Sequence, residues 1–285
     1  MSSVRPAECG FDYLSTTWPD EIRNTSLGNM RNVIEWAEQR PLNIGGKDFT
    51  KPWAWQGYIG YKIGQVCIGE RPDGCIVRLE GKAAHEWAKA GLPTGHNITR
   101  LDIALTVWGI PNQSEVIARH NVEGVAHRKT LQSRPFAVRL IDGNGDGDTL
   151  YLGSRSSEQF VRVYDKERSP NGGKQYKTAV RYECECKEQL ALSAYQRCVN
   201  PGYSATSCLS ILTGLLARRG ISPVGIGSVQ PAIIAPSIAH ISDLESALSW
   251  LGVQVRPTVA RLMAEGYEEE VLTALGLARL FNPGY

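Results

Sequence analysis

The chain has 285 residues, of which 42% are hydrophobic and 21% are charged, enough apolar material for one large domain or for two small ones that share a sheet. This composition excludes a disordered tail and a fibre. The formal net charge of +2 is small, so a polyanionic partner would have to be bound by a local basic patch.

The cysteines and the apolar runs exclude two further classes of protein. Seven Cys include a single C-x-C pair, Cys184 and Cys186, and no C-x-x-C pair, which predicts reduced thiols and no structural zinc site. The N-terminus lacks the features of a signal peptide, and no apolar run is long enough to span a membrane. We therefore expect a cytoplasmic protein with no membrane contact.

The first hundred residues predict a strand, a helix, a β-rich stretch and a second helix. The strand lies over 11–17, and the helix lies near 28–39, where apolar residues recur at helical spacing. From Trp53 onward, aromatic and β-branched residues alternate around the turn at 70–74, which indicates a hairpin. A short helix follows over 83–90.

The next hundred residues repeat this order. A strand at 100–109 precedes a helix within 111–124, a hairpin at 136–154 and another hairpin at 157–187. These elements predict an α+β fold with antiparallel sheets, flanking helices and two related lobes, residues 1–98 and 99–208, in one catalytic domain. Residues 209–285 are expected to form a helical C-terminal region after a Gly/Pro-rich connection.

The hairpin at 157–187 has a register that charge pairing can test. Centring it on Gly172 and Gly173 places Arg162 opposite Glu183 and Tyr164 opposite Arg181. One face is then apolar. The other face carries Arg162, Tyr164, Lys166, Arg181, Glu183, Glu185 and Lys187.

A tyrosine among cations and carboxylates is suited to nucleophilic attack on a phosphodiester. Its phenol has an unperturbed pKa of about 10, so nearby positive charge or a metal must favour the phenolate, and the same charge would bind the phosphate. The alternative interpretation is a solvated sheet face with salt bridges, which the pattern alone leaves open.

Two aspartates lie in otherwise apolar strands. Asp102 shares one strand face with Arg100, and a buried carboxylate there needs either that arginine or a bound cation. Asp12 is a weaker instance of the same kind. The stretch from Asp142 to Gly147 imitates part of a calcium loop but has Gly153 where a glutamate is required, so a hairpin turn is predicted.

These motifs together resemble a known family. The segments GFDYLST, TRLDIALTV, GDTLYLGSRSSEQFVRVYDKE and VRYECECKEQLA, in this order, resemble the replication initiation factors of rolling-circle plasmids, filamentous phages and integrative elements, with the phage branch most similar. The resemblance spans roughly residues 10 to 200.

The resemblance implies metal-dependent nicking of one strand at a double-stranded origin, through a 5′-phosphotyrosyl intermediate that leaves a 3′-OH primer. Tyr164 matches the nucleophile, with Lys166 and Arg162 as phosphate or DNA contacts. Carboxylates would hold Mg²⁺ or Mn²⁺, and the matching positions are Asp102, Glu183 and, as a third ligand, Asp12. Glu185 is ranked below Glu183 because it lies about 6.6 Å further along the strand. Further DNA contacts are assigned to Arg181, Lys187 and Arg155.

The implied partners are origin DNA with single-stranded character at the nick, a host helicase and the replication machinery of a bacterial cell, with a homodimer as an option. A conjugative relaxase and a DNA-binding regulator without catalysis remain alternatives. The tail from Ser242 holds six acidic residues against three Arg, so it is a poor DNA-binding surface. Its apolar face, with Leu244, Leu248 and Leu251, must pack on the chain itself or on another protein.

Overall fold

The computed structural model describes residues 7–19, 50–72, 74–90, 97–131, 135–143, 147–169, 177–200, 202–227, 229, 231–232, 259, 262–263 and 266–267. The helix expected at 28–39 and the apolar face of the tail lie outside these residues. The chain divides into two compact units, residues 1–236 and 237–285. The sheet and its helices belong to the first unit.

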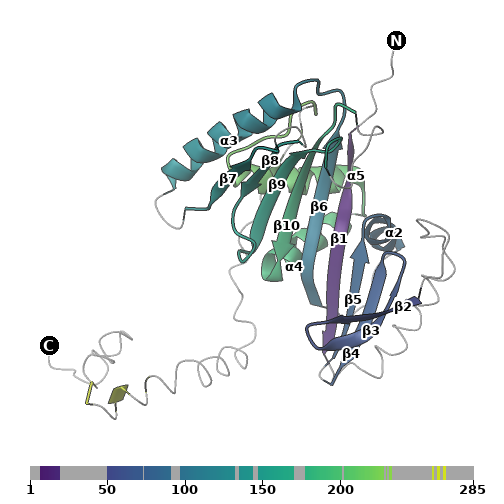
Figure 1. The fold of residues 1–285 in the computed structure, drawn as a ribbon. Coiled ribbons are helices and arrows are strands. Elements are labelled where there is room, and N and C mark those ends of the chain that lie inside the picture. The colour runs from purple at the N-terminus through teal and green to yellow at the C-terminus, as the bar shows by residue number, and fades with distance from the viewer. Residues whose placement is uncertain are drawn as a thin grey trace. The chain divides into compact units, whose positions relative to one another are not determined.

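Ten strands among the described residues form one antiparallel sheet, which confirms the predicted α+β class (Figure 1). Their order across the sheet is β2-β3-β4-β5-β1-β6-β10-β9-β8-β7. The strands are β1 (Glu8–Pro19), β2 (Thr50–Trp55), β3 (Tyr58–Ile63), β4 (Val66–Arg71), β5 (Gly74–Glu80), β6 (Asn97–Val107), β7 (Val138–Ile141), β8 (Thr149–Leu152), β9 (Gln159–Asp165) and β10 (Val180–Lys187). The region after Trp53 therefore holds four strands, where the sequence predicts a single hairpin.

The sheet consists of two halves with the same topology. In one half β1 is followed by β2 to β5, and β5 returns to pair with β1; in the other β6 is followed by β7 to β10, and β10 returns to pair with β6. The long strands β1 and β6 pair with each other, so the two predicted lobes share one continuous sheet. Helix α2 (Lys82–Ala90) follows the first half and α4 (Glu188–Val199) follows the second.

The helices pack on one face of the sheet. Helix α4 packs mainly on β6, α5 (Ala205–Ala217) packs on β1 and β6, and α3 (Gln113–Thr130) packs on β7 to β9. In Figure 1, α4 and α5 pass behind the central strands. The core between these layers includes the fully buried side chains of Leu14, Leu101, Ile103 and Tyr182. The opposite face of the sheet carries the polar residues.

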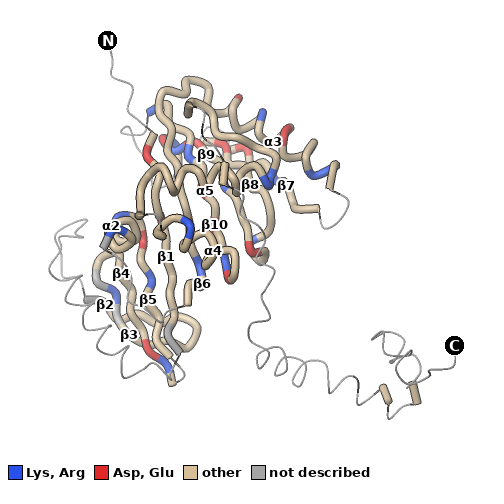
Figure 2. Tube along the Cα trace, turned by 180° about the vertical axis from the view of Figure 1, so that it is seen from behind, with Lys and Arg blue, Asp and Glu red and all other residues tan. Residues whose placement is uncertain are grey.

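Local sequence explains the helices. Ser204 and Ser207 form a reciprocal capping box at the start of α5. Figure 2 shows acidic and basic residues alternating along α3, whose outer surface includes the Arg119–Glu123 ion pair. Helix α4 was not predicted, although its buried Leu190, Ala194 and Cys198 recur at helical spacing. No helix in the described part of the chain is long and apolar enough to cross a membrane.

The division expected after residue 208 falls inside α5. Because α5 packs against the two central strands, the first compact unit continues to Pro236. The helical character expected of the C-terminal region stays a prediction, because almost all of residues 237–285 lie outside the described part of the chain.

Candidate active site

Strands β9 and β10 present the predicted polar face with the predicted register. Arg181 lies opposite Tyr164, and Glu183 lies opposite Arg162. The intervening residues, including Tyr182 and Cys184, are fully buried against the helices. The alternation of the two strands therefore turns the tyrosine and its charged neighbours to the face of the sheet opposite the described helices.

Glu183 is the centre of a compact hydrogen-bonding cluster. Its Oε1 accepts a hydrogen bond from the Tyr164 hydroxyl at 2.6 Å and another from Arg181 Nε at 2.7 Å. Its Oε2 pairs with an Arg162 guanidinium nitrogen at 2.6 Å. One buried carboxylate thus holds the candidate nucleophile and two arginines.

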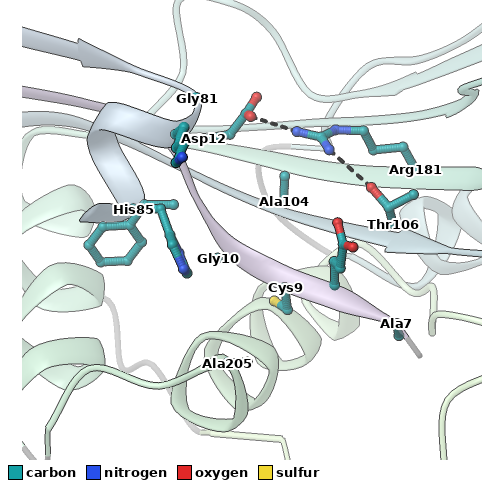
Figure 3. A pocket seen from close by; sticks show the side chains of 13 residues that line it. Ala7, Cys9, Gly10, Asp12, Gly81, His85, Ala104, Thr106, Arg181 and Ala205 are labelled. Atoms are coloured by element: carbon teal, nitrogen blue, oxygen red, sulfur yellow. Dashed lines mark hydrogen bonds and ion pairs between the residues drawn. The ribbon is translucent and has the colours of Figure 1, made fainter. Parts of the chain in front are cut away.

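A β-bulge brings Asp12 into this cluster. Phe11 pairs with Ile103 and Tyr13 pairs with Asp102, so Asp12 is an extra residue in β1 between two regular pairs. Its carboxylate reaches the Arg181 guanidinium at 2.6 Å, and the same guanidinium donates to Thr106 Oγ1 at 3.0 Å (Figure 3). Arg181 is thereby fixed at both ends of its guanidinium.

The charges around Tyr164 do not produce a phenolate in this arrangement. Burial raises the pKa of Tyr164, and the neighbouring Glu183 carboxylate raises it further, although Arg181 acts in the opposite sense. Burial alone would raise the pKa of Glu183, but Arg181 and Arg162 outweigh it and hold that pKa below its usual value. Contrary to the prediction from the sequence, the cations do not favour the phenolate in this arrangement. They stabilise the ionised form of the Glu183 carboxylate instead.

A second cluster lies beside the first on the same face. Arg100 binds both oxygens of Asp102, at 2.8 and 2.7 Å, and also pairs with Glu185 at 2.8 Å. Glu185 pairs in addition with Lys187 at 3.0 Å. Asp102 and Glu185 are direct cross-strand partners, whereas Glu183 lies opposite Ala104. The alternative that Asp102 pairs with Arg100 is thus what the structure contains.

The three residues expected to hold a metal fall into these two clusters. Asp12 and Glu183 are bridged by Arg181, while Asp102 is bound by Arg100. The described residues include no group of three His, Cys, Asp or Glu placed to hold a metal ion. As arranged here, arginine nitrogens contact the carboxylates of all three residues, so a divalent cation would have to displace at least one arginine to bind them.

The remaining predicted residues lie near the tyrosine or at the strand ends. Lys166 is buried, with its Nζ 5.6 Å from the Tyr164 ring centroid, and its pKa is lowered by burial and by Arg181. Lys187 donates to the backbone carbonyl of Arg155, whose guanidinium lies over the Phe160 ring. The structure therefore brings Lys166 to the tyrosine and leaves Arg155 with the second cluster.

Comparison with known proteins finds a match to one family. Residues 96–218 match the sequence profile described as replication initiation factor.

A solved structure shares the fold. The chain is similar to the rolling circle replication initiator protein from Geobacillus stearothermophilus, with a TM-score of 0.53 and 19% sequence identity, over 75% of this chain and 85% of that one. At this identity the likeness establishes a common fold. No curated protein matches the sequence significantly.

The segment that matches the replication initiation factor profile contains most of the predicted site. It begins just before β6 and ends after α5, so it includes the half of the sheet that carries Tyr164 and both acidic clusters. Asp12 is the one predicted site residue outside it. The pairing of Glu185 with Arg100 and the hydrogen bond that Thr106 accepts from Arg181 were not predicted from the sequence. Strand alternation could have indicated both, because both residues lie on the polar face.

A pocket lies beside residues 8–12 of β1. Among the described strands, these residues are next to β6 on one side, and the pairing with β5 on the other side begins only at Tyr13. Its volume is about 450 Å³, and its walls include Gly10, Asp12, His85, Thr106 and Arg181 (Figure 3). A Cβ at Gly10 would lie 2.7 Å from His85 Nδ1, so a larger residue would fill the narrow side. Arg181 therefore lines this pocket and also belongs to the polar face of the sheet.

Proposed function

We propose that this chain initiates rolling-circle replication by nicking one DNA strand at a double-stranded origin, with Tyr164 as the nucleophile. The observation that carries the proposal is the 2.6 Å hydrogen bond from the Tyr164 hydroxyl to Glu183, flanked by Arg162 and Arg181. In this arrangement the phenol can act as the nucleophile and the carboxylate as the base, while the two guanidinium groups bind the phosphate.

The proposed reaction transfers a phosphodiester from DNA to the tyrosine. The Tyr164 oxygen attacks the phosphorus while its proton passes to Glu183. The bond from phosphorus to the 3′-oxygen breaks, leaving a 5′-phosphotyrosyl link and a free 3′-OH. Lys166, whose pKa is lowered by burial and by Arg181, is placed to give a proton to the departing oxygen.

Phosphate binding would itself activate the base. In the arrangement described, Arg162 and Arg181 hold the pKa of Glu183 low. A phosphate that draws these guanidinium groups away leaves Glu183 with fewer donors and a higher proton affinity. Glu183 then accepts the phenol proton only when the substrate is in place.

The test is covalent capture of DNA. Wild-type protein incubated with supercoiled DNA carrying its own origin should give nicked circles with protein on the 5′ end. Tyr164→Phe should lose the adduct completely and keep DNA affinity within about threefold, because the ring packing stays and only the hydroxyl is removed. A gel that resolves nicked circles from protein-linked DNA measures both results.

Tyr151→Phe is the matched control. Tyr151 lies opposite Arg162 in the sheet, on the same face as Tyr164, and has no contact with Glu183 among the described interactions. It should nick like the wild type. Adduct formation by Tyr164→Phe at the wild-type level would refute the assignment of the nucleophile.

A requirement for Mg²⁺ or Mn²⁺ is proposed from the resemblance alone. We expect EDTA to stop nicking and Mn²⁺ to restore it. Nicking that continues in EDTA would mean that the arginine-bound carboxylates described above are the working form of the site. The helicase and homodimer also stay proposals.

A further inference from the structure

Aromatic rings and an arginine continue the candidate active site across the other half of the sheet. The register places Tyr13 opposite Asp102 and Glu80, and Arg78 opposite Ser15 and Cys67, so both side chains lie on the same face of the sheet as the candidate active site. The Arg78 guanidinium lies 5.3 Å from the Tyr13 ring centroid, 5.6 Å from that of Trp53 and 4.8 Å from that of Trp55. We call Tyr13, Arg78, Trp53 and Trp55 the aromatic row.

The rings of this row lie close to bare backbone. Trp53 pairs with Gly60, and Gly60 pairs with Gly69 on the next strand. A Cβ at Gly69 would stand 2.8 Å from the Trp53 ring. The absence of a side chain at Gly69 thus lets the indole lie on the sheet. Trp53 and Trp55 stack with centroids 6.5 Å apart at an interplanar angle of 22°.

The row is joined to the candidate active site by Arg100. Its guanidinium lies 4.4 Å from the Tyr13 ring centroid and binds Asp102 and Glu185 at the same time. The open face therefore carries a continuous series of charged and aromatic groups from β9 to β2. Tyr13 of the row thus lies against Arg100 of the second cluster.

Charge and exposure indicate what the row binds. Arg78 has no carboxylate partner in the described part of the chain, unlike Arg100, Arg162 and Arg181. The Trp55 side chain is 38% exposed although it is a large aromatic group. Arg78 Nε donates a hydrogen bond to the Tyr13 hydroxyl. A guanidinium whose described partners are neutral, set among aromatic rings, suits a ligand that has both phosphates and flat apolar faces.

We propose that the aromatic row is a single-stranded DNA track, on which bases of the strand running to or from the nick stack on Trp55 and its neighbours while Arg78 contacts the backbone. This rests on the proposed function, which requires unpaired DNA beside Tyr164. Stacking on rings tolerates any base, so the track holds the strand and leaves origin choice to other contacts. Paired bases of a duplex do not offer their faces in this way.

The test compares substitutions at one exposed position. Binding of a fluorescent thymidine oligonucleotide of about 20 residues to the full chain is measured by anisotropy. Trp55→Ala and Trp55→Leu should each weaken binding about tenfold, whereas Trp55→Phe should stay within about threefold of the wild type. Binding of a blunt duplex of the same length should change by less than about twofold in all three.

Ile59→Ala is the matched control. Ile59 lies on the neighbouring strand with its side chain on the opposite face, and it is 74% exposed. It should bind both oligonucleotides like the wild type. Wild-type affinity of Trp55→Ala for the single strand would overturn the proposal. Equal affinities of Trp55→Leu and Trp55→Phe would also overturn it, since that result indicates an apolar protein-binding surface.

The outcome is separable from the proposed function. Loss of single-strand binding in Trp55→Ala supports the track even if Tyr164→Phe still forms an adduct, because the oligonucleotide assay involves no cleavage. Conversely, nicking by Tyr164 with unchanged binding in Trp55→Ala leaves the active site in place and removes the track.

Discussion

At the scale of single residues, Glu183 decides the chemistry of the site. It is buried, yet it remains ionised because two arginines and the Tyr164 hydroxyl donate to its oxygens. Without these donors, a carboxylate so buried would already carry a proton before DNA binds and could not accept the proton of Tyr164. In the proposed mechanism, Glu183 is therefore the base at the centre of the site, and Tyr164, the proposed nucleophile, stays neutral until DNA binds.

The pH dependence of nicking should expose this role. Glu183 stays ionised at neutral pH because its pKa is held low, while the pKa of Tyr164 is raised. The wild-type rate should therefore be nearly constant between about pH 6 and 9. In Glu183→Gln the proton must leave to hydroxide, so the rate should fall on the order of 10²- to 10⁴-fold and rise about tenfold per pH unit.

Single-turnover nicking of an origin oligonucleotide across this pH range makes the comparison. Glu185→Gln is the control, because Glu185 lies on the same strand face but contacts Arg100 and Lys187 instead of the tyrosine. A flat profile in Glu183→Gln would remove Glu183 from the role of base.

At the scale of elements, the bulge in β1 determines which residues reach the site. Because Asp12 is an extra residue, Phe11 and Tyr13 point to opposite faces of the sheet although they are two positions apart in the sequence. With it, Phe11 stays in the core, Tyr13 joins the aromatic row, and Asp12 bonds to Arg181. One inserted residue thus serves both halves of the polar face.

Deleting Asp12 should leave a regular strand. Phe11, Tyr13 and Leu14 would then alternate between the two faces as they already do, so the protein should fold with a melting temperature lowered by no more than about 5 °C. Deleting Ser15 instead puts Leu14 and Thr16, both buried, next to each other. That strand must slip by one residue and expose core side chains, and we expect an insoluble product.

Thermal melting followed by circular dichroism compares the two deletions. Equal loss of structure in both would show that the extra residue is required for folding as well as for placing Asp12.

At the scale of the whole molecule, the two halves of the sheet share a topology but carry different side chains on the polar face. The pairs Tyr13–Glu80 and Asp102–Glu185 occupy corresponding positions on either side of the contact between β1 and β6. Two residues along each strand, Arg78 in the first half corresponds to Glu183 in the second. The same backbone position thus holds a cation among rings in one half and the proposed base in the other.

The first compact unit should function without the tail. Residues 1–236 contain the whole sheet and the helices that cover it, so a chain ending at Pro236 should melt within about 4 °C of the full chain and form the Tyr164 adduct at the wild-type rate. Melting curves and the adduct assay on purified protein measure this. An unfolded or aggregated product would show that residues 237–285 cover apolar surface of the first unit.

The sequence by itself determined the antiparallel α+β class and the composition of the polar face. Strands β9 and β10 are consecutive in the chain, so the centre predicted for their connection sets every cross-strand pair. Strand alternation then decides which side chains share a face. The tertiary structure alone decided that Asp102 meets Glu185, that Asp12 reaches Arg181, and that the rings of β2 lie beside Arg78. These contacts depend on the register between strands far apart in the chain and on a bulge, and no turn or local pattern specifies either.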